Sequence, residues 1–225
     1  MGMELTADYD ALREEMVNQV VYYATQIGQQ TGCTELSEAV LDAMMNVPRH
    51  EFVPAKVQAM AYVDSPLPIG CGKTISQPYI VALMTDLLNV QKTDRVLEVG
   101  TGLGYQTAIL ARLSKTVFTV EIIEELARKA AQSLTTQGHR NINMGIGDGS
   151  LGWAEHAPFD KILVAAAPEM IPTSLLYQLK AGGRMVIPAG LEDTQQLMLV
   201  EKDVDGQLHS QEILHVRFSP LEDAE

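Results

Sequence analysis

Apolar side chains recur every three or four residues near the start of the chain, which is the spacing of one face of a helix. The pattern runs over residues 8–29 and predicts a long amphipathic helix. Residues 30–34 interrupt it, and residues 36–45 predict a second helix that ends before Pro48. The apolar positions of the first helix are Tyr9, Leu12, Met16, Val20, Tyr23 and Ile27.

Residues 48–77 lack this spacing and are rich in proline and glycine. Such a composition indicates loops, which we expect to lie over the core. Pro78 then suits the first turn of a helix, because proline has no backbone N–H to leave unpaired there. We expect that helix to run to about Leu88.

From residue 94 onward, short apolar runs alternate with helical patterns. Because strands alternate with helices, this order predicts a parallel sheet that is covered on both faces. The predicted strands are residues 96–99, 117–120, 142–146, 162–166 and 184–187, and the predicted helices are residues 105–113, 122–134 and 174–179.

Two further apolar runs, residues 197–200 and 212–218, have no helix between them. Asp205 and Gly206 lie in the connection and suit a hairpin turn. The sequence therefore predicts an α/β, Rossmann-like fold with a mostly parallel central sheet, helices on both faces and a C-terminal antiparallel hairpin. We expect residues 1–77 to form a helical and loop extension that packs on the core and covers the functional site, and residues 78–225 to form the main domain.

Charge and hydropathy limit the binding partners and the cellular compartment that we expect. The 225 residues carry a net charge of −13 at pH 7, whereas nucleic-acid-binding proteins usually show a basic face. No apolar run reaches the roughly 20 residues of a membrane span. The acidic residues Glu4, Asp8 and Asp10 disfavour a secretory signal peptide, which begins basic. We expect a cytoplasmic protein that contacts neither nucleic acid nor membrane.

The cysteines and histidines show no metal-binding pattern. Cys33 and Cys71 lie far apart and lack the spacing of metal ligands. The five histidines are equally scattered. We expect reduced thiols, as is usual in the cytosol, and no metal ion.

The strongest local motif is VLEVGTGLGY at residues 96–105, in which a buried strand leads into a glycine loop and then a helix. Glycines allow sharp turns and the close approach of a ligand, and ligands of open α/β sheets bind beyond the carboxyl ends of the strands. The loop residues are Gly100, Thr101, Gly102, Leu103 and Gly104.

The spacing of this loop favours one nucleotide cofactor over another. A dinucleotide fingerprint reads G-x-G-x-x-G, whereas this loop reads G-x-G-x-G and has Tyr105 where the third small residue should stand. S-adenosylmethionine has no pyrophosphate to hold, but it has a cationic sulfonium that an acidic residue can stabilise. Glu98, two residues before the loop, is the candidate for that role.

Two more acidic residues follow predicted strands. Glu121 lies 21 residues after Gly100, where a carboxylate can accept both ribose hydroxyls. This position fits NAD as well as S-adenosylmethionine. Asp148, between two glycines after the third strand, can accept the adenine amino group. Their neighbours Ile122 and Gly149 are candidates for flanking the ring.

The segment before the glycine loop adds a family resemblance. It reads LPIGCGKTISQPYIVALM and resembles the region of protein-L-isoaspartate O-methyltransferases that covers the cofactor and receives the substrate. The resemblance covers roughly residues 35–221. Other matching segments are PRHEFVPA at 48–55, VFTVE at 117–121, GDGSLGW at 147–153, APFDKILV at 157–164, QLKAGGRMVIP at 178–188 and VRFSPL at 216–221.

This resemblance implies a class I methyltransferase that carries a methyl group from S-adenosylmethionine to the free α-carboxylate of L-isoaspartyl residues in damaged proteins. The methyl ester then closes to a succinimide, part of which opens to normal aspartate. Such an enzyme is expected to act as a monomer or a weak homo-oligomer.

The resemblance also implies roles for single residues. Ile75, Ser76 and Gln77 would lie across the cofactor, and the Ser76 hydroxyl would orient the substrate carboxylate. Pro78 would fix the exit of the loop. Residues Val216, Phe218 and Ser219 would pair with the substrate backbone.

The chain departs from the family pattern at two places. Ser219 replaces a valine that is usual in the family, and the stretch between Met16 and Leu36 is longer than in common bacterial members. A longer N-terminal helix could cap the substrate cleft or form an oligomer contact.

Three other functions remain open at this point. The first is a methyltransferase of the same fold with another acceptor, such as a small carboxylic acid or a tRNA base, because acceptor identity lies in loops. The second is a cofactor-binding module without catalysis, and the third is an NAD-dependent oxidoreductase.

Overall fold

The computed structural model describes residues 8–223. Glu4, which belongs to the acidic start used above, lies outside the described residues. Among the described residues, no helix is both long enough and apolar enough to cross a membrane.

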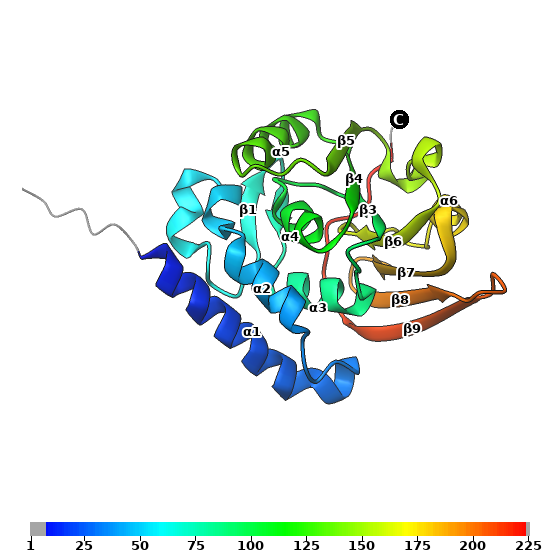
Figure 1. The fold of residues 1–225 in the computed structure, drawn as a ribbon, viewed down its shortest axis with the longest axis horizontal. Coiled ribbons are helices and arrows are strands. Elements are labelled where there is room, and N and C mark those ends of the chain that lie inside the picture. The colour runs from blue at the N-terminus through cyan, green and yellow to red at the C-terminus, as the bar shows by residue number, and fades with distance from the viewer. Residues whose placement is uncertain (1–7, 224–225) are drawn as a thin grey trace, which may run out of the picture.

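A seven-stranded sheet forms the centre of the molecule (Figure 1). The strands lie in the order β5-β4-β3-β6-β7-β8-β9, and the pairs from β5 to β7 are parallel whereas β8 and β9 are antiparallel. The predicted fold class is therefore confirmed. The strands are β3 (Arg95–Val99), β4 (Thr116–Glu121), β5 (Ile142–Ile146), β6 (Phe159–Val164), β7 (Leu179–Ala189), β8 (Gln196–Lys202) and β9 (Leu208–His215).

Helices cover both faces of the sheet. Successive side chains of each strand point to opposite faces, so each strand contributes to two cores. In β3, Val96 packs into a core that is shared with helices α1 to α5, whereas Leu97 packs into a second core with α6. Buried runs without polar alternation are typical of such doubly covered strands. The helices are α1 (Tyr9–Thr31), α2 (Glu38–Asn46), α3 (Pro78–Leu88), α4 (Tyr105–Leu113), α5 (Glu124–Thr136) and α6 (Thr173–Gln178).

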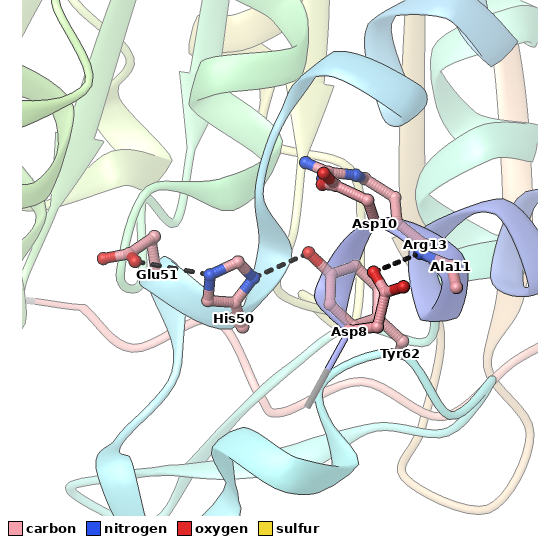
Figure 2. Close-up of polar contacts among 7 residues, drawn as sticks. All are labelled: Asp8, Asp10, Ala11, Arg13, His50, Glu51 and Tyr62. Carbon is pink, nitrogen blue, oxygen red and sulfur yellow. Dashed lines mark hydrogen bonds and ion pairs between the residues drawn. The ribbon is translucent and has the colours of Figure 1, made fainter. Parts of the chain in front are cut away.

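Helix α1 is attached to the rest of the fold at its first turn. The Asp8 side chain accepts a hydrogen bond from the Ala11 amide, which caps the helix. Tyr9 stacks on the His50 ring at 3.9 Å between centroids. Figure 2 shows His50 hydrogen-bonded to the Tyr62 hydroxyl, at 2.7 Å from Nδ1. Three segments that are distant in sequence thus meet at one imidazole.

The predicted loop over residues 48–77 is wrong in part. The segment contains two short 3-10 helices, Arg49–Phe52 and Ala55–Met60, and a hairpin of β1 (Leu67–Gly70) and β2 (Lys73–Ile75). Its strands are only four and three residues long, which is too short to produce a recognisable alternation.

The last predicted strand, over residues 212–218, is also misplaced. Strand β9 begins at Leu208. The sequence did not indicate this start, because the first residues of β9 form an exposed edge without apolar alternation. It ends at His215, and Phe218 then donates its amide to the Gln195 side chain at 2.6 Å instead of continuing the ladder. Val216 and Phe218 therefore lie in an irregular segment. The turn at Gly206, with φ of 84°, matches the predicted hairpin.

Candidate active site

A cavity lies at the carboxyl ends of β3 and β4, against the glycine loop. Gly100, Gly102 and Gly104 have φ of 91°, 57° and 97°, a region that residues with a Cβ rarely adopt. The loop is attached to the next strand, because the Gly100 amide donates to the Val120 carbonyl at 2.8 Å. Of the five loop residues, Gly100, Thr101, Gly102 and Leu103 line the cavity, and Gly104 is the N-cap residue of α4.

Glu121 lies where a carboxylate that binds the cofactor ribose is expected. It lines the cavity at the end of β4. One carboxylate oxygen accepts the Gly102 amide at 2.8 Å and the other accepts the Ile123 amide at 3.0 Å. Each oxygen keeps a further lone pair, so the carboxylate is held in place and still has acceptor capacity towards a ligand. Its neighbour Ile122 lines the same cavity.

Glu98 takes a different position from the one expected. It is 0% exposed and does not line the cavity. Its Oε2 accepts hydrogen bonds from Thr107 at 2.5 Å and from Thr119 at 2.7 Å, and burial raises the pKa of the carboxyl to about 7. The Thr119 hydroxyl also lies 2.6 Å from that of Thr101. Glu98 thus reaches the cavity only through two threonine hydroxyls.

Gly149 lines the cavity, whereas Asp148 lies beside it. A Cβ on Gly149 would come within 2.3 Å of Val99 Cγ1, so the close packing of this turn on β3 requires glycine. One Asp148 carboxylate oxygen accepts the Ser150 amide at 2.8 Å, which leaves the other oxygen without a described partner. Gly149 thus borders the cavity, and the flanking of an adenine ring by this residue stays a prediction.

The segment Ile75-Ser76-Gln77 runs past the cavity and into α3. Ile75 and Ser76 line the cavity. The Ser76 hydroxyl makes no hydrogen bond to another described residue, and it does not cap α3, whose N-cap residue is Gln77. Pro78 is buried at the first position of α3. The hydroxyl is consequently available to a ligand.

A second cavity, which we call the outer groove, adjoins the first. Its volume of about 500 Å³ lies within the range of ligand sites. The two cavities have Thr74, Ser76, Ala165 and Ser219 in common. The other predicted substrate residues, Val216 and Phe218, line the outer groove together with Gln77. Ser76 therefore lies at the junction of the two cavities.

Sequence reasoning missed the residues that hold Ser76 in place. Arg49 is 0% exposed and donates from Nη2 to the Ser76 carbonyl at 2.7 Å and from Nε to the Ala61 carbonyl at 2.8 Å. Burial lowers the pKa of its guanidinium to about 10. The Asp64 carboxylate accepts from the Gln77 side chain and from the Tyr79 amide. Their burial and pairing depend on contacts between distant segments, although Arg49 does stand in the conspicuous PRHEFVPA motif.

Two residues across the cavity mouth were also missed. Lys73 Nζ lies 2.6 Å from Glu222 Oε1, and both residues line the cavity. The pair joins the β1–β2 hairpin to the C-terminal segment, which runs back over the carboxyl ends of the strands (Figure 1). Over residues 8–223, no group of three or more His, Cys, Asp or Glu side chains could hold a metal ion.

A Rossmann-like sheet ending in an antiparallel hairpin, with a G-x-G-x-G loop and a strand-end glutamate around one cavity, defines a class I methyltransferase. The solved structures agree with this class. One, a protein-L-isoaspartate O-methyltransferase, superposes with a TM-score of 0.78 at 28% identity, covering 91% of this chain and 65% of that one. A structure from Plasmodium falciparum, described as a beta-aspartate methyltransferase in complex with S-adenosyl-L-homocysteine, shares the fold with a TM-score of 0.79 at 22% identity over 97% of this chain and 100% of its own.

The sequence comparisons are more specific. The family model of protein-L-isoaspartate(D-aspartate) O-methyltransferase matches residues 25–225. Protein-L-isoaspartate O-methyltransferase 1 of Polaromonas sp. is 54% identical over 100% of this chain and 95% of its own length. A second relative, from Syntrophobacter fumaroxidans, is 54% identical over 95% of this chain and 87% of its own. The chain belongs to the protein-L-isoaspartate(D-aspartate) O-methyltransferase family, and the resemblance seen in its motifs is confirmed.

Proposed function

We propose that this chain transfers a methyl group from S-adenosylmethionine to the free α-carboxylate of L-isoaspartyl residues in damaged proteins. Membership of the family supports this reaction, and the neighbour solved with S-adenosyl-L-homocysteine supports the cofactor. The observation that carries the proposal is the unpaired Ser76 hydroxyl at the point where the two cavities meet.

The cofactor cavity suits an adenosine-containing sulfonium compound, which supplies an electrophilic methyl group when bound. The positive-φ glycines leave room for a ligand against the loop, and Glu121 offers carboxylate oxygens to ribose hydroxyls. Asp148 and Gly149 hold the adenine end. Glu98 acts at one remove, by keeping Thr119 and Thr101 oriented. Ile75, Ser76 and Gln77 close the site from the side of the outer groove.

The acceptor needs no strong base, since a carboxylate with a pKa near 4 is already ionised at pH 7. The enzyme must instead align one carboxylate oxygen with the methyl–sulfur bond, and positioning of this kind contributes about 7–11 kcal/mol in favourable cases. Ser76 donates a hydrogen bond to the carboxylate and sets its direction. Arg49 and Asp64 keep the segment around Ser76 rigid.

The lining of the outer groove is consistent with an anionic acceptor. None of the described residues that line it is acidic, although the chain contains 29 Asp and Glu. Arg217 also lines it, in an exposed ion pair with Glu192 at 3.5 Å. A groove of this kind admits a carboxylate without the repulsion that like charges produce. The peptide backbone lies along Val216, Phe218 and Ser219.

The product ester decomposes without further help from the protein. The neighbouring backbone amide attacks the ester carbonyl, methanol leaves, and a succinimide forms. Water opens part of the succinimide to normal aspartate, and the remainder returns to isoaspartate as substrate. The methyl transfer thus initiates repair.

The setting follows from charge and thiol chemistry. We place the enzyme in the cytoplasm, acting on isoaspartyl proteins and peptides without a nucleic-acid partner, as a monomer or weak homo-oligomer. The net charge of −13 supports the choice of partner, and the free thiols of Cys33 and Cys71 support the compartment. Residues 1–77 act as an extension that covers the site of the domain formed by residues 78–225.

The test is methyl transfer from labelled S-adenosylmethionine to an isoaspartyl peptide, with the corresponding aspartyl peptide as control. We expect base-labile label in the isoaspartyl peptide alone. Ser76→Ala should lower kcat by about ten- to a hundredfold, the range for one lost hydrogen bond to a charged group, while cofactor affinity changes by less than about threefold. Label in neither peptide, despite cofactor binding, would remove the proposed acceptor.

A further inference from the structure

Helix α1 forms part of the outer groove. Tyr23 and Ile27 line it, and they lie one turn apart on the same face of the helix. On the other side stand residues 214–219, which are the end of β9 and the segment after it, and which include Val216 and Phe218. Figure 1 shows α1 lying along the outside of the fold, next to α3 and close to the start of the C-terminal segment.

Tyr23 is held in place although it is partly open to solvent. Its ring centroid lies 6.2 Å from that of Tyr79, at an interplanar angle of 58°, and Tyr79 is buried at the start of α3. Tilted aromatic pairs at this distance are attractive. Tyr23 is 37% exposed, which leaves part of the ring free to contact a ligand.

The occupant of this part of the groove follows from its connection to the acceptor site. Ser76 and Ser219 line both cavities, so a peptide whose isoaspartyl carboxylate reaches Ser76 must lead its neighbouring residues into the outer groove. On the α1 side of that path the lining side chains are Tyr23 and Ile27, and none of the described lining residues is acidic. A flanking apolar side chain finds a contact there, whereas a flanking carboxylate would have only Arg217, which already lies 3.5 Å from Glu192.

We propose that Tyr23 and Ile27 form an apolar subsite for the side chain of a residue next to the isoaspartate, so that α1 selects among damaged sites by their sequence context. The inference rests on the proposed acceptor. It assigns substrate preference to a helix that supplies no residue to the cofactor cavity.

The experiment uses isoaspartyl pentapeptides that differ only in one flanking residue, placed before or after the isoaspartate: Phe, Leu, Gly or Glu. The full-length enzyme should prefer Phe or Leu over Gly by about five- to tenfold in kcat/KM on at least one side, since burial of an apolar side chain is favourable by roughly that factor or more. Most of this preference should appear in KM.

Adjacent tyrosines supply a matched control. Tyr22 is 60% exposed and does not line the groove. Tyr23→Ala should reduce the Phe-over-Gly preference to less than about twofold. Tyr22→Ala should keep the preference of the unaltered enzyme, and Tyr23→Phe should keep it as well, which separates loss of the ring from damage to the helix. Ile27→Ala should lower the Leu-over-Gly preference.

Two results would overturn the inference, and they differ from each other. If the unaltered enzyme methylates all the isoaspartyl peptides equally, or if Tyr22→Ala and Tyr23→Ala have the same effect, the subsite is wrong while the proposed function stands. If the enzyme binds S-adenosylmethionine but methylates no isoaspartyl peptide, the proposed function fails and the subsite fails with it.

Discussion

Glu98 is a buried carboxylate that lies directly behind the cavity, where its burial disfavours the charged form. The carboxylate is enclosed, and only one of its oxygens has hydrogen-bond partners among the described residues. A charged group in such a place is penalised by lost hydration, which is why its pKa rises to about 7. Burial within the strand therefore favours the neutral, protonated form of Glu98.

This environment predicts a pH-dependent effect of Glu98→Gln. Because the pKa of Glu98 is higher in the folded protein, this group contributes its full stabilisation below the unfolded pKa of about 4.5. The folded protein loses that stabilisation as the pH rises through about 7. Glutamine has no such loss. Between pH 5.5 and pH 8 the variant should therefore gain about 2 kcal/mol in unfolding free energy relative to the unaltered protein.

Urea unfolding of both proteins at several pH values measures this difference. A difference that stays constant between pH 5.5 and 8 would show that the carboxyl titrates normally and that the buried network is more hydrated than its contacts indicate.

At the scale of elements, two short segments enclose the cofactor cavity from opposite ends of the chain. The β1–β2 hairpin contributes Lys73 and the C-terminal segment contributes Glu222. Neither segment packs a large core of its own. Their ion pair, partly exposed, is the polar contact that links them directly.

We expect Lys73→Ala and Glu222→Ala each to raise the Kd for S-adenosylmethionine by about two- to threefold, because a partly exposed pair contributes less than about 1 kcal/mol. The double variant should be no weaker than the worse single variant, since both changes break the same contact. Arg128→Ala, which breaks an exposed pair on α5 with Glu124, is the control and should leave the Kd unchanged.

Calorimetric titration at low salt and at high salt measures these values. Screening by salt should reduce the gap between the unaltered protein and the single variants. Additive effects in the double variant would mean that each residue contacts the ligand independently and that the ion pair contributes nothing.

At the scale of the whole molecule, the first turn of α1 is joined to distant segments at His50, whose polar contacts appear in Figure 2. His50 stacks on Tyr9 and lies 2.7 Å from the Tyr62 hydroxyl and 3.3 Å from Glu51. Burial, the largest cause, lowers the pKa of His50. The folded protein therefore binds a proton at this position more weakly than the unfolded chain does.

His50→Gln should destabilise the fold by about 1 kcal/mol at pH 8, through the lost stacking and hydrogen bond. A lowered histidine pKa makes the stability of the unaltered protein fall as pH drops below the unfolded value of about 6.5. The variant lacks this loss, so the gap between the two should narrow from pH 8 to pH 5.5. Thermal melts across that range check it, and a gap that widens on acidification would contradict it.

Much of this protein could be derived from local pattern alone. The helices at Pro78–Leu88 and Tyr105–Leu113 and the strand at Ile142–Ile146 have the predicted bounds, because proline, glycine and apolar spacing act within a few residues. The strand–glycine loop–helix motif lies against a cavity for the same reason. The glutamate at the end of a strand, Glu121, and the ISQP segment at residues 75–78 then indicated one family.

Other features were decided only when distant segments came together. Whether Glu98 faced the cavity or lay behind it depended on Thr107 and Thr119, which a β-strand position does not specify. The β1–β2 hairpin and the exposed start of β9 carry too little apolar pattern to be recognised. Arg49, Asp64 and the α1 wall of the outer groove act through contacts over tens of residues.

The amino-acid sequence by itself determined the order of the elements, the glycine loop and the family, since these rest on local propensity and short motifs. The tertiary structure alone decided which carboxylates are buried, which hydroxyl is free and which helix lines the outer groove. The physical reason is that burial and pairing are set by where the chain returns to itself, and that return depends on all the packed elements together.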